Sequence, residues 1–312
     1  MSKFHLPYPQ YTAEFNIDFK DKLCFLGSCF SDHIGHLAHE HGLNVLSNPF
    51  GTTFHPQPII DMLRASITDS VELNLLNKIT YVTDWGSAHR LQSVTAKAHK
   101  DLVISKRKQL KQQISGHAFL FITFGTSIGY RHKTLNKIVA NCHKQPSELF
   151  SKEATSMNEI YESWEAIIEE LQSWNPELNI IFTVSPVRHI KDGLVANNRS
   201  KSRLSAAIEL LERKKNISYF PSFEFINDVL RDYRFFNTDL IHPSDQAINE
   251  VWRLFDQAYL NRSNSEISQK IAKLNKAKRH KEMNKNTTES EKHQAWIEKQ
   301  NLLIDQLLNQ SS

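Results

Sequence analysis

The sequence predicts an α/β fold in which helices cover both faces of a parallel β-sheet. Short apolar runs bounded by Gly, Pro, Asn or Ser are typical of buried strands, and they occur at 22–26, 44–46, 119–124, 179–184 and 217–220. Segments with helical apolar spacing follow at 30–41, 58–67, 95–114, 157–174 and 201–214. Alternation of this kind indicates a parallel sheet, whose functional residues lie in the loops after the carboxyl ends of the strands.

The composition is that of a folded protein with a sizeable core. Hydrophobic residues make up 40% of the 312 residues and charged residues 23%, which is ordinary for a globular protein. The three cysteines, Cys24, Cys29 and Cys142, are too few for a disulfide framework. The first residues lack an apolar signal segment, and no apolar run approaches the roughly 20 residues that span a bilayer. We therefore expect a cytoplasmic protein with no membrane span.

The formal net charge of +4 resides in the C-terminal part of the chain. From Arg262 onward there are ten Lys or Arg and six Asp or Glu residues, so the preceding body is neutral overall. A basic segment of this kind is usually a solvated helix surface. Because zinc-finger spacing and an aromatic-basic stripe are both absent from the sequence, we expect no nucleic-acid partner.

The chain divides into a body, residues 1–260, and a polar C-terminal tail, residues 261–312. Apolar spacing returns near the end of the tail, where Ile297, Ile304 and Leu308 lie close to heptad positions. This spacing indicates a helix that docks on the body or mediates oligomerisation with a partner chain. The alternative is a frayed polar terminus. On either view, deletion from about Asn264 onward is expected to leave the body folded.

Two side chains that can act as nucleophiles, Ser28 and Cys29, follow the first predicted strand and Gly27. They stand where a helix begins, and the free N–H groups and dipole of a helix start favour a thiolate or an oxyanion. A cysteine in this setting is expected to have a lowered pKa and to be reactive. The alternative is that Cys29 is a small buried residue under the helix. Position alone does not decide between these two interpretations.

Hydrogen-bond donors follow the second and third strands. Residues 47–56, SNPFGTTFHP, contain Asn48, whose side-chain amide can donate, and Gly51, which permits a sharp turn. After the third strand, Gly125, Thr126 and Ser127 supply N–H groups and hydroxyls that suit a developing negative charge. The loop after the second strand means little by itself, whereas the loop after the third strand is a candidate for holding an oxyanion.

Asp239 and His242 follow the last strand, just before Pro243 and a helix that Ser244 is expected to cap. On a loop, this spacing lets the carboxylate hold one imidazole nitrogen while the other points into the cleft. A D-x-x-H pair is common by chance. Its position after the last strand, with a nucleophile after the first, indicates an acyl-transfer site.

These motifs, in this order, resemble the SGNH/GDSL hydrolase superfamily and, more narrowly, the GSCFA domain family. The narrower resemblance rests on GSCFS, NPFGTTFHP, NCHK, SPVRHIKDG, SK and LRDYRFFNTDLIHPS. It runs from about Phe25 to Phe255, and Ser31 stands where the family's name has Ala. The resemblance implies a three-layer α/β/α sandwich around a five-stranded parallel sheet, an SGNH hydrolase-like and flavodoxin-like fold.

The resemblance also implies roles for individual residues. SGNH enzymes begin with Phe-x-Gly-Asp-Ser, so the nucleophile is the second residue after the glycine. In this chain that residue is Cys29, and Ser28 takes the place of the aspartate. Gly51 matches the oxyanion glycine of the superfamily, and Asn48 matches the asparagine that often precedes it.

The third block of the superfamily, usually Gly-x-Asn-Asp, is altered. Ser127 occupies the asparagine position and Ile128 the aspartate position. This departure weakens the usual oxyanion hole and puts simple esterase activity in doubt. Ser127 and Asn141 are the expected substitute donors.

Other polar residues have a functional and a structural interpretation. Arg188 and His189 follow the fourth strand and either contact an anionic substrate group or pair with Asp192. Asn141 and His143 either line the site or act as helix caps and buried hydrogen-bonding partners. The histidines of HIGHLAHEH are spread around a predicted helix without a completing carboxylate or cysteine, so no metal is expected; they are His33, His36, His39 and His41.

The sequence thus predicts hydrolysis of an ester, or O-acyl transfer, by a Cys29–His242–Asp239 triad that needs no cofactor. Ser28 remains the alternative nucleophile. The substrate class, a small-molecule or carbohydrate ester, rests on superfamily analogy alone. The rival hypothesis is a catalytically silent ligand-binding or scaffold module that retains the pocket, which the altered third block favours.

Overall fold

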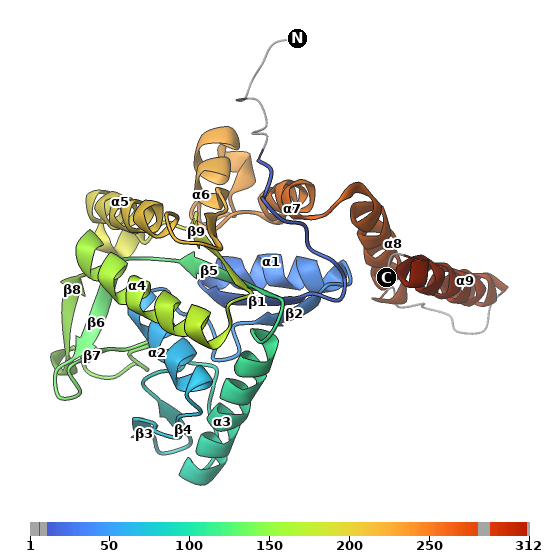
Figure 1. The fold of residues 1–312 in the computed structure, drawn as a ribbon. Helices are drawn as coiled ribbons and strands as arrows, with labels where there is room; N and C mark the ends of the chain where they lie inside the picture. Colours follow the sequence, from blue (N-terminus) through green and yellow to red (C-terminus); the bar gives the residue numbers. More distant parts are fainter. Residues whose placement is uncertain (1–5, 7–10, 280–287, 311–312) are drawn as a thin grey trace.

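A five-stranded, all-parallel sheet forms the centre of the computed structural model, which describes residues 6, 11–279 and 288–310 (Figure 1). Its strands are β1 (Lys22–Gly27), β2 (Asn44–Ser47), β5 (Ala118–Phe124), β9 (Leu178–Val184) and β10 (Ile217–Tyr219). They lie in the spatial order β10-β9-β5-β1-β2. The five strands predicted from apolar runs are therefore the five strands of this sheet.

Helices cover both faces of the sheet, which confirms the predicted three-layer α/β/α sandwich. One face packs against α1 (Cys29–Glu40) and α7 (Asp245–Tyr259), and the other against α2 (Pro56–Ile67), α3 (Ala96–Gln113), α4 (Met157–Trp174) and α5 (Leu194–Leu211). Side chains alternate along β1, so Leu23 and Phe25 join the first core and Cys24 and Leu26 the second. Burial on both faces explains why the strands are continuous apolar runs.

The strand order changes direction between β1 and β5, and this is where such sheets bind ligands, beyond the carboxyl ends of the strands. Gly27 ends β1 at this point, opposite Thr123 of β5. Its φ is +127°, and a Cβ at this position would lie 2.1 Å from the carbonyl oxygen of Thr123. Only glycine permits so close an approach, and the loop that follows carries Ser28 and Cys29.

Two small antiparallel sheets were not predicted from the sequence. The hairpin β3 (Leu75–Asn77) and β4 (Val82–Asp84) lies between α2 and α3, and a three-stranded sheet follows β5, formed by β6 (Ile128–His132), β7 (Lys137–Ile138) and β8 (Phe150–Ala154). Most residues of β3 and β8 are partly or fully exposed, so these strands lack an apolar run. Short helical turns complete the body: η1 (Ser147–Leu149), η2 (Ile190–Asp192), α6 (Ser222–Glu224), η3 (Phe225–Val229) and η4 (Tyr233–Phe235).

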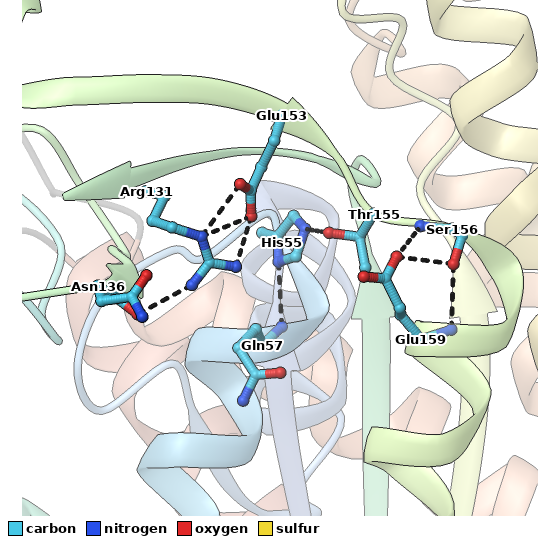
Figure 2. A network of polar contacts seen from close by, with 8 residues as sticks. All are labelled: His55, Gln57, Arg131, Asn136, Glu153, Thr155, Ser156 and Glu159. Carbon is cyan, nitrogen blue, oxygen red and sulfur yellow. Dashed lines mark hydrogen bonds and ion pairs between the residues drawn. The ribbon is translucent and has the colours of Figure 1, made fainter. Parts of the chain in front are cut away.

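The side chain of His55 caps the start of α2 and connects it to Thr155, the residue just after β8 (Figure 2). Its Nδ1 accepts a hydrogen bond from the N–H of Gln57 at 3.1 Å, so Nε2 carries the proton that Thr155 Oγ1 accepts at 3.0 Å. Burial lowers the pKa of His55 to about 4, which keeps the ring neutral. Beside it, the guanidinium of Arg131 donates hydrogen bonds to both carboxylate oxygens of Glu153 on β8. This network fixes the small sheet against the body.

Two helices follow the body, α8 (Arg262–Arg279) and α9 (Thr288–Gln310), and they extend to one side of it (Figure 1). Asn264 is only 3% exposed and donates to the carbonyl of Ile17 at 3.2 Å, and Ile267 is equally buried. The predicted apolar residues Ile297 and Ile304 of α9 pack on α8. The expectation that deletion from Asn264 leaves the body folded stays a prediction, and such a deletion would remove these contacts between α8 and the body. No helix in the described ranges is long and apolar enough to cross a membrane.

Candidate functional site

A cleft of about 760 Å³ opens beyond the carboxyl ends of β1 and β2. Five separate segments line it: the start of α1, the loop after β2, the turn before α3, helix α3 itself through Lys106, and the loop after β7. Among the predicted site residues, the cleft brings together Cys29, Asn48, Gly51 and Asn141. These residues come from three separate parts of the sequence, so the fold rather than local sequence assembles the cleft.

Cys29, not Ser28, faces this cleft. Ser28 is 1% exposed, and its Oγ accepts a hydrogen bond from the N–H of Phe30 at 3.3 Å as the N-cap of α1. Cys29 is the first residue of the helix, and its thiol lies against the backbone N–H groups of Cys29 and Phe30. The serine hydroxyl is thus engaged in holding the helix start, while the thiol borders open space.

The environment of Cys29 raises the pKa of its thiol. Burial is the largest cause and the nearby Asp32 carboxylate is the second, and together they outweigh the N–H groups of the helix start and the charge of Lys201. The lowered pKa expected from the helix start is therefore wrong for this structure. A helix start favours a thiolate, but partial burial and an anion one turn along the same helix oppose it more strongly.

Asn48 organises the loop that carries the nucleophile. Its Oδ1 accepts from the N–H of Gly27 at 2.8 Å, and its Nδ2 donates to Asp32 Oδ1 at 2.7 Å. The same Nδ2 lies 3.5 Å from the carbonyl of Ser28. Its amide therefore holds the ends of β1 and α1 together, and its N–H group is directed to a carboxylate rather than to an oxyanion.

Gly51 permits a close approach of two loops. Its φ is +81°, and a Cβ here would lie 2.5 Å from the Cβ of Ala88. Its N–H donates to the carbonyl of Asn48 at 2.8 Å, and the N–H of Ala88 donates to the carbonyl of Phe50 at 2.9 Å. The Gly51 amide, expected to hold an oxyanion, is thus engaged within its own turn. The next residue, Thr52, also lines the cleft.

The two substitute donors differ in access to the cleft. Ser127 is fully buried, and both its N–H and its hydroxyl bond to Ser200 Oγ, at 2.7 and 3.2 Å. Asn141 lines the cleft, and its Oδ1 accepts from the N–H of His143 at 2.7 Å. In the described part of the chain, the Nδ2 group of Asn141 has no hydrogen-bond partner. Asn141 is therefore the better placed donor.

The predicted contact between Asp239 and His242 is present. His242 Nδ1 lies 2.6 Å from Asp239 Oδ2, and Asp239 Oδ1 accepts from the N–H groups of Ile241 and His242. These N–H groups, with the imidazole, lower the pKa of Asp239 to about 2. Because Nδ1 is bound to the carboxylate, Nε2 is the nitrogen left for proton transfer. Both side chains are about half exposed, and neither is among the described residues lining the cleft.

Ser200 and Lys201, adjacent on α5, organise the loops after β5 and β9. Lys201 is 3% exposed, and its Nζ donates to the carbonyls of Gly125 at 2.6 Å and Ser185 at 2.7 Å. Burial and the charge of Arg188 lower the pKa of Lys201 to about 7, and the Cys29 thiol opposes this shift. A buried ammonium therefore lies within electrostatic reach of Cys29. Sequence reasoning missed it because a charged residue in a helix is normally exposed.

The remaining predicted residues lie apart from the cleft. His189 contacts the ring edge of Phe54, and burial with the charge of Lys201 lowers its pKa to about 4. His143 is buried, and its Nε2 donates to the carbonyl of Asp84 at 2.9 Å. Asp192, the expected partner of Arg188, binds Lys152 instead. His143 is therefore a buried hydrogen-bonding partner that does not line the cleft.

The histidines of α1 point in different directions. His33 lines the cleft, whereas His41, just after the helix, contacts the ring of Trp252 and bonds Ser268 Oγ at 3.3 Å. Within the described ranges, no three His, Cys, Asp or Glu side chains form a group that could hold a metal ion.

Sequence reasoning also gave no role in the cleft to five charged or titratable residues that line it: Asp32, His33, His89, Arg90 and Lys106. The first two had a detectable signal, because positions three and four residues after Cys29 fall on the same face of a helix. Arg90 had none, since it reaches the cleft from an irregular turn before α3.

A sequence model of the GSCFA family matches residues 22–255. No curated protein and no solved structure matches the chain.

Proposed function

Because this chain belongs to the GSCFA family, we propose that it is an SGNH-like hydrolase or O-acyltransferase that acts on an ester through Cys29. One observation carries the proposal. A cysteine at the end of β1 and the start of α1 borders a cleft, with backbone N–H groups against its sulfur. The Asp239–His242 pair, on the loop after the last strand, supplies the acid-base group of the proposed site.

In the first step, His242 Nε2 takes the proton of the Cys29 thiol while Asp239 holds Nδ1. The sulfur attacks the ester carbonyl, the S–C bond forms, and the carbonyl π electrons move to oxygen. The N–H of Cys29 and the side chain of Asn141 stabilise this oxyanion. When the oxyanion collapses, the C–O bond breaks and the alkoxide takes the proton from His242. A thioester remains on Cys29.

In the second step, His242 takes a proton from water or from an acceptor hydroxyl, whose oxygen attacks the thioester. Collapse of the second oxyanion breaks the C–S bond, and the thiolate takes the proton back from His242. With water the product is an acid, and with an alcohol, such as a sugar hydroxyl, it is a new ester. Lys201 favours the thiolate in both steps because its buried charge lies within electrostatic reach of Cys29.

The proposal is tested by incubating the full-length protein with p-nitrophenyl acetate and following p-nitrophenol release and protein mass. Release and one acetyl group on the peptide that contains Cys29 are expected. Cys29→Ala should abolish both signals. Ser28→Ala should retain acetylation while weakening the cap of α1 by about 1 kcal/mol. Acetylation lost in Ser28→Ala but kept in Cys29→Ala would make Ser28 the nucleophile.

A catalytically silent binding module is the second candidate. It is favoured by the raised pKa of the Cys29 thiol and by the engaged N–H groups of Gly51 and Ser127. A panel of acetylated sugars and short acyl esters separates the two. Binding without turnover, unaffected by Cys29→Ala, would support the module and contradict the acyl-transfer proposal.

A further inference from the structure

The cleft beside Cys29 carries an excess of positive charge. Two residues with fixed positive charge line it, Arg90 and Lys106, together with the titratable His33 and His89. Among its described lining residues there is a single carboxylate, Asp32. Burial raises the pKa of Asp32, and the charges of His33 and Arg90 act in the opposite direction. The charge of Arg90 therefore acts on Asp32, which lies within one helical turn of Cys29.

The turn that carries Arg90 is anchored to the nucleophile side of the cleft. The N–H of Ala88 donates to the carbonyl of Phe50 at 2.9 Å, and the N–H of Leu91 donates to the carbonyl of Ala88 at 3.0 Å. The Cβ of Ala88 packs against Gly51. These contacts hold the turn beside the loop after β2, so Arg90 has a defined position in the cleft wall.

Neither cation forms an ion pair with a carboxylate within the described part of the protein. Lys106 Nζ donates to Gln109 Oε1 at 3.2 Å, and an amide carries no charge. The guanidinium of Arg90 makes no hydrogen bond or ion pair with a described residue. Some other cations of the body have a carboxylate partner, as Arg253 has Glu250 and Lys152 has Asp192. The pair in the cleft is thus available to a ligand.

We infer that the molecule bound beside Cys29 is an anion, an ester that carries a carboxylate or phosphate group which Arg90 and Lys106 contact while its carbonyl lies at the thiol. That this anion is an ester rests on the proposed function. The anion site itself rests only on the charges of the cleft. Arg90 suits such a group because a guanidinium binds carboxylate and phosphate oxygens through two parallel N–H bonds.

The test uses two alkylating reagents of similar size, anionic iodoacetate and neutral iodoacetamide, on the full chain carrying Cys142→Ser. Cys24 is 1% exposed, so Cys29 is the thiol that reacts. The iodoacetate-to-iodoacetamide rate ratio at Cys29 should exceed that of free cysteine about five- to tenfold. Since screening weakens such attraction, the excess should shrink at high salt. The double variant Arg90→Gln, Lys106→Gln should lose it.

Lys108→Gln is the matched control, because this exposed lysine lies on the same helix as Lys106 without lining the cleft. It should keep the wild-type ratio. A ratio equal to that of free cysteine, or one that the double variant leaves unchanged, overturns the inference. Alkylation needs no turnover, so anion selectivity with no ester hydrolysed would sustain the anion site and count against the proposed function alone.

A second measurement does not depend on reaction at Cys29. The thermal unfolding midpoint is recorded in sodium phosphate, in sodium acetate and in sodium chloride of equal ionic strength. A rise in phosphate or in acetate, kept by Lys108→Gln and lost in the double variant, supports the inference and identifies the group preferred. Identical midpoints in all three salts for the wild type would contradict it.

Discussion

Asn48 Nδ2 donates a hydrogen bond to Asp32 Oδ1 at 2.7 Å, and this bond fixes a carboxylate one turn along the helix from Cys29. The same asparagine accepts from the N–H of Gly27 at the end of β1. One side chain therefore positions both the loop before the nucleophile and the anion that raises the pKa of its thiol. The reactivity of Cys29 is set by this arrangement as well as by the helix start.

Removal of the Asp32 charge should lower the pKa of the Cys29 thiol. Asp32→Asn keeps an oxygen for Asn48 while abolishing the anion, so Cys29 should react with iodoacetamide several-fold faster at neutral pH. Lys201→Met removes the opposing charge and should shift the pH–rate profile to higher pH. The profiles are measured in a Cys142→Ser background, with exposed Asp101→Asn as control. Slower labelling of Asp32→Asn would contradict this account.

His242 should be the proton acceptor of the proposed reaction. His242→Ala should lower p-nitrophenyl acetate turnover by about 10²–10⁴-fold, the usual contribution of general base catalysis. Asp239→Asn should lower it as well, because the carboxylate holds Nδ1. His33→Ala is the informative comparison, since His33 lines the cleft with Cys29. A large loss of turnover in His33→Ala, with no loss in His242→Ala, would show that His33 of α1 is the general base.

Stability should fall between pH 6.5 and pH 4, in part because of His55. Its pKa is about 4 in the folded protein and 6.5 ordinarily, so the unfolded chain binds the proton first as pH falls. One such proton gives a slope of at most about 1.4 kcal/mol per pH unit. His55→Asn preserves a capping side chain and should flatten this slope in urea unfolding. The control His36→Asn, at an exposed position, should leave the pH dependence of the unfolding free energy unchanged. Equal slopes in His55→Asn and the wild type would refute the assignment to His55.

The body should require α8 and tolerate the loss of α9. A chain ending at residue 279 keeps Asn264 and Ile267 in place and should unfold cooperatively near the full-length urea midpoint. A chain ending at residue 263 loses these contacts. Burial of one side chain such as Ile267 contributes about 1.5–3 kcal/mol, so its midpoint should fall clearly. Indistinguishable midpoints for the two truncations would show that α8 does not support the body.

The central sheet could be predicted because its strands are buried on both faces and are therefore marked by unbroken apolar runs. Phe121 and Ile122 on β5 face opposite cores, and both are buried. The small sheets could not be found this way, since β8 has one buried residue out of five. Helix α5 begins at Leu194 rather than at 201, because its first seven residues, LVANNRS, carry no helical apolar period.

The sequence predicted which residues form parts of the candidate site, but it did not predict the charges and pKa shifts within the site. The positions of Cys29 and the Asp239–His242 contact follow from motif spacing, which constrains neighbours along the chain. The raised thiol pKa depends on burial and on Asp32, and the engagement of Ser127 depends on Ser200 of a distant helix. Such effects arise from contacts between segments far apart in sequence, so a local pattern cannot reveal them.

Helix α1 runs from the cleft at its first residue to the contact with α8 at its last residue. Its first residue is Cys29, and its last, Glu40, accepts through its carbonyl from Asn275 of α8 at 2.8 Å. At 1.5 Å per residue, the twelve residues place these ends about 18 Å apart. An affinity tag, a fluorophore or an immobilising tether attached C-terminal to α9 would therefore leave the Cys29 thiol accessible. The protein can be attached to a surface by its carboxyl end for single-molecule or flow experiments on the cleft.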